Sequence, residues 1–162
     1  GVPFAIRYPR GRGIGADWSG GFRRMEIGRG ITLRGGKDVA VLAIGTVTND
    51  ALKAAVQAEE EGISAEVVSL RFAKPLDTAI LHDVGRRFRR IITVEDGTVE
   101  GGVGSAVAEF ISANGYTAEV VRLGIPDTFI HRGTIAELKR ICGYDTEGIL
   151  TAIRKAAGRE KP

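Results

Sequence analysis

From residue 36 onward, short apolar runs alternate with longer segments in which apolar residues recur every three or four positions. A continuous apolar run is typical of a strand buried within a parallel sheet. The longer periodicity is typical of amphipathic helices. Strands that alternate with helices predict a parallel sheet covered by helices on both faces. The expected strands are Val39–Ile44, Ala65–Leu70, Ile91–Val94 and Val120–Leu123.

Capping residues and glycines mark the expected helix boundaries. Asp77 stands at a helix start, where an aspartate commonly accepts a backbone hydrogen bond, so we interpret it as a cap and not as a catalytic base. Thr134 and Glu137 have the spacing of a capping box. The first expected helix is capped by Thr48 or Asn49, runs to about Glu61 and is ended by Gly62; the second starts at Pro75 and Asp77, with Leu81, Val84 and Phe88 on one face. The third starts at about Val103 and is closed by Asn114 and Gly115. The fourth starts at Thr134, with Leu138, Ile141 and Cys142 inward, and the last runs from Asp145 to about Ala157.

The first 36 residues follow a different pattern. Phe4–Tyr8 and Ile27–Leu33 are expected to be short strands, and the glycine-rich segment Gly11–Gly15 between them is expected to be a loop. Gly35 and Gly36 lie in the short link from Ile27–Leu33 to the next strand, and a short link of this kind predicts a hairpin. We therefore expect one antiparallel strand, paired with Val39–Ile44, in an otherwise parallel sheet.

The length and composition of the chain indicate a globular domain and not a membrane-spanning protein. The chain has 162 residues, 43% apolar and 27% charged, which suits one globular domain. No apolar run approaches the roughly 20 residues that span a bilayer, so no membrane partner is expected. The single cysteine, Cys142, forms no internal disulfide, which fits a reducing compartment. The chain begins with glycine and its one methionine is Met25, so we expect a piece of a longer protein.

The formal net charge is +3, and arginines dominate the basic residues. A nucleic-acid-binding face would combine such charges with aromatic residues for base stacking. The aromatic residues are few and scattered, so we interpret the arginine groups as solvated surface and expect no nucleic-acid partner. The run Arg86–Arg90 falls at the expected end of a helix, where cations meet the dipole favourably.

A glycine-rich turn follows the strand Ile91–Val94 and opens a helix. Such turns often hold phosphate, because a helix N-terminus carries about half a positive charge. Here the turn contains Glu95, Asp96 and Glu100 and no lysine. Three carboxylates outweigh the helix dipole, so we expect these glycines to permit close backbone packing and not to bind phosphate.

The best candidate for an anion site is the segment Arg7–Gly11. Pro9 holds Tyr8 extended, and Gly11 lets the chain turn after Arg10. Arginines beside an aromatic ring can hold a phosphate through paired hydrogen bonds. An exposed basic segment that links domains explains the same residues equally well.

No catalytic or metal-binding set is evident elsewhere. His82 is expected on a helix surface or in packing, and His131, in a loop, could lie against a ligand. Neither histidine has metal-ligand spacing, and Ser105 has no nearby base. Phe129 and Ile130 are expected to pack onto the core or onto a partner. The sequence therefore predicts no catalytic residue and no cofactor or metal ligand.

Taken together and in order, six segments resemble the C-terminal part of the 1-deoxy-D-xylulose-5-phosphate synthase family. A similar glycine-rich turn occurs more widely in transketolase C-terminal domains and in pyruvate dehydrogenase beta subunits. The Tyr-Pro-Arg-Gly opening and the Pro-Asp-x-Phe-Ile segment favour the synthase. The segments are Arg7–Gly11, Ile27–Gly30, Val39–Thr46, Arg71–Asp77, Glu95–Phe110, and Leu123–Ile130 followed by Gly133 and Thr134.

The resemblance implies a three-layer α/β/α domain with a five-stranded, mostly parallel sheet and one antiparallel strand. It implies an interdomain linker over residues 1–26 and a transketolase C-terminal-like domain over residues 27–162. The whole enzyme of this family is a cytoplasmic homodimeric transferase that uses thiamine diphosphate and magnesium. It condenses pyruvate with glyceraldehyde 3-phosphate, releases carbon dioxide and feeds isoprenoid and thiamine biosynthesis.

The resemblance also implies that Arg10, with Tyr8, contacts the phosphate of the aldehyde substrate. The diphosphate motif of the family, Gly-Asp-Gly followed by asparagine, is absent from this chain. The glutamate that activates the thiazolium belongs to a middle domain. The chain alone is therefore expected to be inactive and to bind no cofactor, with the N-terminal and middle domains as its partners. A transketolase, a keto-acid dehydrogenase beta subunit and a free-standing anion-binding module remain the alternatives.

Overall fold

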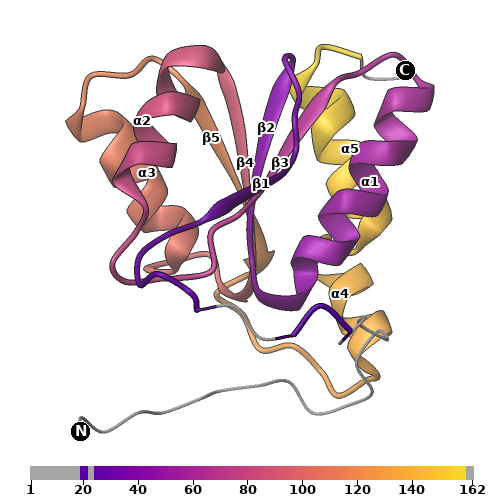
Figure 1. The fold of residues 1–162 in the computed structure, drawn as a ribbon. Helices are drawn as coiled ribbons and strands as arrows, with labels where there is room; N and C mark the ends of the chain where they lie inside the picture. Colours follow the sequence, from indigo (N-terminus) through magenta and orange to yellow (C-terminus); the bar gives the residue numbers. More distant parts are fainter. Residues whose placement is uncertain (1–18, 22–23, 160–162) are drawn as a thin grey trace, which may run out of the picture.

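The computed structural model describes residues 19–21 and 24–159 and contains one five-stranded sheet (Figure 1). The strand order is β1-β3-β2-β4-β5, with β2 to β5 parallel and β1 antiparallel to β3. This arrangement confirms the predicted mostly parallel sheet with one antiparallel strand. The strands are β1 (Ile31–Arg34), β2 (Val39–Ile44), β3 (Ala65–Ser69), β4 (Arg90–Thr98) and β5 (Glu119–Ile125).

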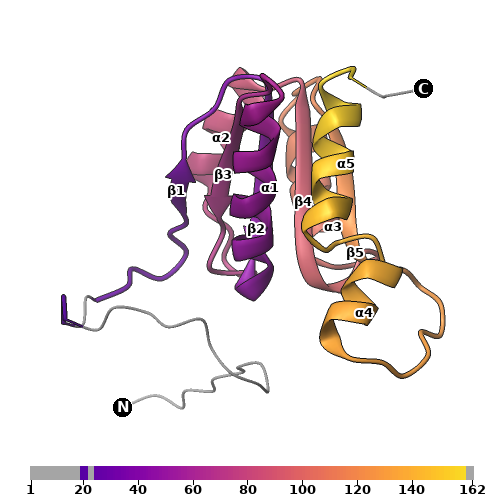
Figure 2. The same cartoon turned by 90° about the vertical axis from the view of Figure 1, so that its right-hand side faces the viewer.

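Helices cover both faces of the sheet, which confirms the three-layer architecture (Figures 1 and 2). One face is covered by α1 (Thr48–Glu60) and α5 (Thr146–Ala156), and the other by α2 (Thr78–Arg87) and α3 (Val103–Ala113). The short α4 (Ile135–Ile141) lies beyond one end of the layers (Figure 2). Within the described part of the chain, no helix is both long and apolar enough to cross a bilayer.

The central strand β2 explains why the apolar runs of this chain are continuous. Val39, Val41 and Ala43 point into the core under α1 and α5. Ala40 and Leu42 point into the second core, under α2 and α3. All five side chains have no exposed surface, because both faces of a central parallel strand are covered.

The predicted hairpin between the first strand and β2 is wrong. β1 pairs with β3, with Ile31 opposite Ser69, and the strand begins at Ile31 and not at Ile27. β2 already has β3 and β4 as its neighbours. A Cβ on Gly36 would lie 2.1 Å from the backbone nitrogen of Glu66, so only glycine lets the link cross the start of β3 at this distance. The link therefore crosses a strand where the sequence suggested a turn.

The start of α1 also differs from the prediction. A short 3-10 turn, Gly45–Val47, leads directly into the helix, and no side chain in the described part of the chain caps it. Thr48 lies inside the first helical turn with its hydroxyl buried, and no hydrogen-bond partner for that hydroxyl is found in the described residues. The Asn49 side chain donates to the Thr46 carbonyl, 3.1 Å away. Gly62 ends the helix with a positive φ of 76°, as predicted.

The other predicted caps are confirmed. Asp145 Oδ1 accepts a hydrogen bond from the Gly148 backbone at 2.9 Å and begins α5. Thr134 and Glu137 form both bonds of a capping box at the start of α4. The inward stripe predicted for α4 is wrong in part, because no residue of α4 is buried and Ile141 is 64% exposed.

Candidate functional site

The loops that follow β2 to β5 gather at one edge of the sheet, at the bottom in Figure 1. Because these strands are parallel, all four carboxyl ends meet there, and ligands of open α/β sheets bind at this edge. Three of the six segments that resemble the synthase family reach into these loops, at residues 71–77, 99–102 and 126–134.

Glu95 occupies the helix N-terminus behind the glycine-rich turn. Its carboxylate accepts hydrogen bonds from the Val103 and Gly104 backbone N–H groups, at 2.9 and 2.8 Å. The side chain is 6% exposed, so both bonds are shielded from water. These are the donors that an incoming phosphate would need. The protein's own carboxylate therefore fills this anion site, and the expectation that the turn does not hold phosphate stays a prediction that this contact supports.

The glycines of this turn permit close approach of the backbone, as predicted. A Cβ on Gly102 would lie 2.2 Å from the Thr98 carbonyl oxygen, and one on Gly104 would lie 2.4 Å from the Thr93 hydroxyl. A Cβ on Gly124, near the end of β5, would lie 2.7 Å from the Gly97 carbonyl oxygen. The turn is thus packed tightly against the neighbouring strand, and side chains are excluded where its backbone touches β5.

Asp77 joins two of the segments that resemble the family. Its Oδ1 accepts from the Ile80 backbone at 3.2 Å and caps α2, as predicted. Its Oδ2 accepts from the Gly30 backbone at 3.0 Å, and Arg29 lies within ion-pair distance. Asp77 therefore fixes the chain that enters β1 against the loop that follows β3. Sequence analysis identified the cap and missed the second hydrogen bond, because the partner lies 47 residues away.

Substitution of Asp77 by alanine tests this double role. We expect the free energy of unfolding to fall by about 2 kcal/mol, since one helix cap and one further, partly buried hydrogen bond are lost. Asp145→Ala is the matched control, because it removes a cap alone and is expected to cost about 1 kcal/mol. Urea denaturation of both variants measures the difference. Equal losses would show that the bond to Gly30 adds nothing.

Arg71 is a cation at this edge that sequence analysis did not single out. It follows β3 with a φ of 60°, in the left-handed region that non-glycine residues seldom adopt. Its side chain is exposed. Residues held in this conformation are enriched at functional sites, so Arg71 is a candidate contact for an anionic group. Its position directly after a strand was the available clue in the sequence.

Partly buried polar contacts fix the segment around α4 to the rest of the edge. Asp50, in the first turn of α1, accepts from Lys139 at 2.7 Å and from Thr146 at 3.2 Å. The Tyr144 hydroxyl donates to the Asp96 carboxylate at 3.0 Å, and burial raises the pKa of Tyr144 above its ordinary value. The position of α4 is therefore determined by specific side chains, although its own residues are not buried.

An exposed apolar surface lies on this same segment. Phe129 is fully exposed, and Ile135 and Ile141 are 60% and 64% exposed. Scattered exposed apolar residues are normal, but three large ones within 13 residues of sequence are unusual for a protein surface. Of the two alternatives for Phe129, the core and a partner, the structure excludes the core.

The remaining candidates fall into three groups. Tyr8 and Arg10 lie outside the described residues, so the phosphate site there stays a prediction. His131 is exposed, three residues before the cap of α4, and its ring forms no hydrogen bond or ion pair with any residue that the structure describes. His82 packs on the Phe110 ring and its Nδ1 lies 2.8 Å from the Tyr116 hydroxyl, which confirms a packing role. Among the residues that the structure describes, no group of three His, Cys, Asp or Glu has metal-ligand geometry.

Comparison with known proteins gives a consistent result. Residues 28–149 match the transketolase C-terminal domain family. The 1-deoxy-D-xylulose-5-phosphate synthase of Bacteroides thetaiotaomicron is 49% identical over 94% of this chain and 24% of its own length. The synthase of Aquifex aeolicus is 45% identical over 96% of this chain and 25% of its own. The chain thus spans about a quarter of the length of these relatives.

A solved structure, described as a split gene transketolase in an inactive beta4 tetramer, has a similar fold. Its TM-score is 0.78, at 38% identity over 86% of this chain and 45% of that one. The similarity agrees with the layered fold and with the mixed sheet.

Proposed function

Because the chain belongs to the transketolase C-terminal domain family, we propose that it is the C-terminal domain of a 1-deoxy-D-xylulose-5-phosphate synthase. The main support for this proposal is the 49% identity to a synthase over 94% of the chain, which exceeds the 38% identity to the split gene transketolase. In this proposal residues 1–26 form the interdomain linker, and residues 27–162 form the domain.

The proposed reaction belongs to the whole enzyme. It joins a two-carbon unit of pyruvate to glyceraldehyde 3-phosphate, with loss of carbon dioxide, in a cytoplasmic pathway to isoprenoids and thiamine. Thiamine diphosphate with magnesium supplies the carbanion chemistry when bound. The described residues do not fit a diphosphate, because Glu95 already fills the helix N-terminus behind the glycine-rich turn. We therefore assign the cofactor to the N-terminal and middle domains.

In this proposal the chain contributes to the enzyme by holding the linker and the other domains in place. Asp77 holds Gly30 and so fixes where the chain emerges from the domain toward residues 1–26. In the proposal, Arg10 and Tyr8 of that linker bind the phosphate of the aldehyde. The exposed Phe129, Ile135 and Ile141 suit contact with the other domains or with the second subunit of a homodimer.

An activity assay tests the proposal. The product of the whole gene, supplied with thiamine diphosphate and magnesium, is expected to form deoxyxylulose phosphate from pyruvate and glyceraldehyde 3-phosphate, with one carbon dioxide per product. The 162-residue chain alone is expected to form none. Mass spectrometry of the product and release of labelled carbon dioxide measure the two outcomes.

The alternatives give different results in the same assay. Two-carbon transfer from a ketose phosphate, without carbon dioxide release, would identify a transketolase. Acetyl transfer to a lipoyl group would identify a keto-acid dehydrogenase. Product formation by the 162-residue chain alone would contradict the assignment of the chemistry to other domains.

A further inference from the structure

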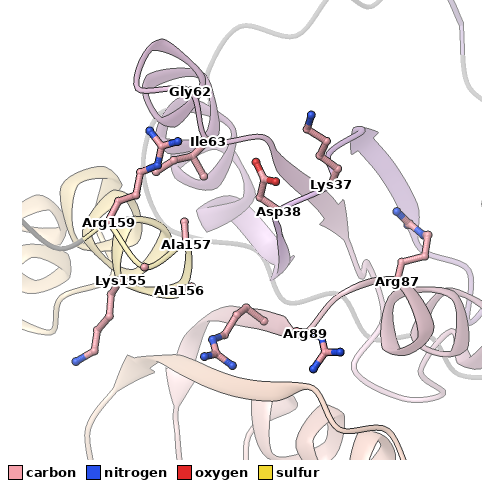
Figure 3. Close-up of a pocket in the computed structure, with 12 residues that line it drawn as sticks. Lys37, Asp38, Gly62, Ile63, Arg87, Arg89, Lys155, Ala156, Ala157 and Arg159 are labelled. Carbon is pink, nitrogen blue, oxygen red and sulfur yellow. The ribbon is translucent and has the colours of Figure 1, made fainter.

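A basic hollow lies at the amino ends of the parallel strands, at the opposite end of the sheet from the glycine-rich turn. Its volume is about 900 Å³, and it is lined by four segments of the chain (Figure 3). These segments precede β2, follow α1, connect α2 to β4 and end α5. The cationic residues among the lining are Lys37, Arg87, Arg89, Arg90, Lys155 and Arg159.

The hollow has a strong excess of positive charge. Asp38 is the one carboxylate in its described lining, and it already accepts a hydrogen bond from the Ser64 backbone at 2.7 Å. The C-terminal ends of α1, α2 and α5 also meet here, and each adds a partial negative charge. That partial negative charge explains why some of the basic side chains lie here, because helix C-termini attract cations.

Several of these cations have structural partners. Arg87 holds the buried Glu66 through two hydrogen bonds, at 2.9 and 2.6 Å, and Asp83 at 2.6 Å. Arg159 donates to the Glu61 carbonyl at 2.8 Å, beyond the end of α1. Such residues stabilise the fold, and the charge of Arg87 is neutralised by its carboxylate partners.

Lys37 and Arg89 differ from the others. Their side chains have no ion pair or hydrogen bond with any residue that the structure describes, although their backbones are fixed. The Lys37 N–H donates to Ser64 at 3.1 Å, and the Arg89 carbonyl accepts from Glu119 at 3.0 Å. The two residues come just before β2 and β4, which are neighbours in the sheet. The fold thus holds two unneutralised cations beside one concave surface.

A concave surface with cations on its walls concentrates anions, and a guanidinium matches the geometry of a phosphate group. Two separated unpaired cations favour an anion with more than one negative charge over a single carboxylate. We propose that the basic hollow binds a small, multiply charged phosphate anion. A ligand here would lie at the opposite end of the sheet from the glycine-rich turn, so we expect it to bind separately from the substrates of the proposed reaction.

Isothermal titration of inorganic pyrophosphate into the 162-residue chain, at physiological ionic strength, tests this site. One pyrophosphate per chain is expected to bind. The double substitution Lys37→Gln with Arg89→Gln is expected to weaken binding about tenfold or more, since two charge-assisted contacts are lost. The control pair Arg132→Gln with Arg140→Gln removes the same charge from exposed positions near α4 and is expected to change affinity less than about twofold.

Amide chemical shifts locate the site independently of any variant. Pyrophosphate is expected to shift the amides of residues 37–38, 62–63 and 87–90. Shifts confined to residues 1–26, equal loss of affinity in both variant pairs, or absence of saturable binding would each overturn the proposal. So would binding of a DNA oligonucleotide without binding of pyrophosphate. None of these outcomes depends on the activity assay, so the anion-site proposal and the synthase proposal are tested independently.

Discussion

Replacing Glu95 with alanine is expected to lower the free energy of unfolding by about 3 kcal/mol, because two charge-assisted hydrogen bonds to backbone N–H groups are lost in a buried place. The carboxylate holds the first turn of α3, at Val103 and Gly104, and it comes from the neighbouring strand β4. Without it, the two adjacent backbone N–H groups lose their acceptor where little water reaches them. Urea denaturation measures the loss.

Two further variants identify the cause. Glu95→Gln keeps one acceptor oxygen and is expected to recover about half of the lost stability. Glu100→Ala, in the same turn but exposed, is expected to change stability by less than about 0.5 kcal/mol. If Glu95→Ala were no more harmful than Glu100→Ala, the carboxylate would not be the cap of α3.

The Arg10→Ala variant of the whole enzyme is expected to raise the KM for glyceraldehyde 3-phosphate by about 10- to 150-fold. One charge-assisted hydrogen bond to a phosphate is worth about 1.5–3 kcal/mol, and a guanidinium keeps its charge at every working pH. The KM for pyruvate is expected to stay within about twofold, because pyruvate carries no phosphate. Steady-state kinetics with each substrate varied in turn measures both values.

Two controls separate Arg10 from general charge loss. Arg12→Ala removes the same charge two residues away and is expected to leave the KM for the aldehyde phosphate within about threefold. With unphosphorylated glyceraldehyde as acceptor, the Arg10→Ala variant and the parent enzyme are expected to behave alike. An unaltered KM for the aldehyde phosphate in the Arg10→Ala variant would remove Arg10 from the substrate site.

Local features of the fold were predictable from the sequence. Asp77, Asp145 and the Thr134–Glu137 pair each act within one helical turn, so their spacing alone defines a cap. The buried strands were equally clear, because a strand covered on both faces needs continuous apolar residues. The presence of an antiparallel strand followed from the short glycine link.

Long-range features were not predictable in the same way. Whether Gly36 makes a turn or crosses a strand depends on which strands already flank β2, and no local pattern records that order. Glu95 was interpreted as one of three repelling carboxylates, although it is the bound anion of the helix itself. Ile141 was assigned to the core from its spacing, but α4 lies beyond the layers and no core reaches it.

The outermost strand has a consequence for solubility. β1 occupies the hydrogen-bonding edge of β3, and the chain reaches that edge through a crossing that only glycine permits at Gly36. A chain shortened to begin at Val39 would leave β3 with open donors and acceptors and a strand rich in valine. Open edges of this kind recruit strands from other molecules. The few residues of β1 therefore keep the edge of β3 paired and unavailable to strands of other molecules.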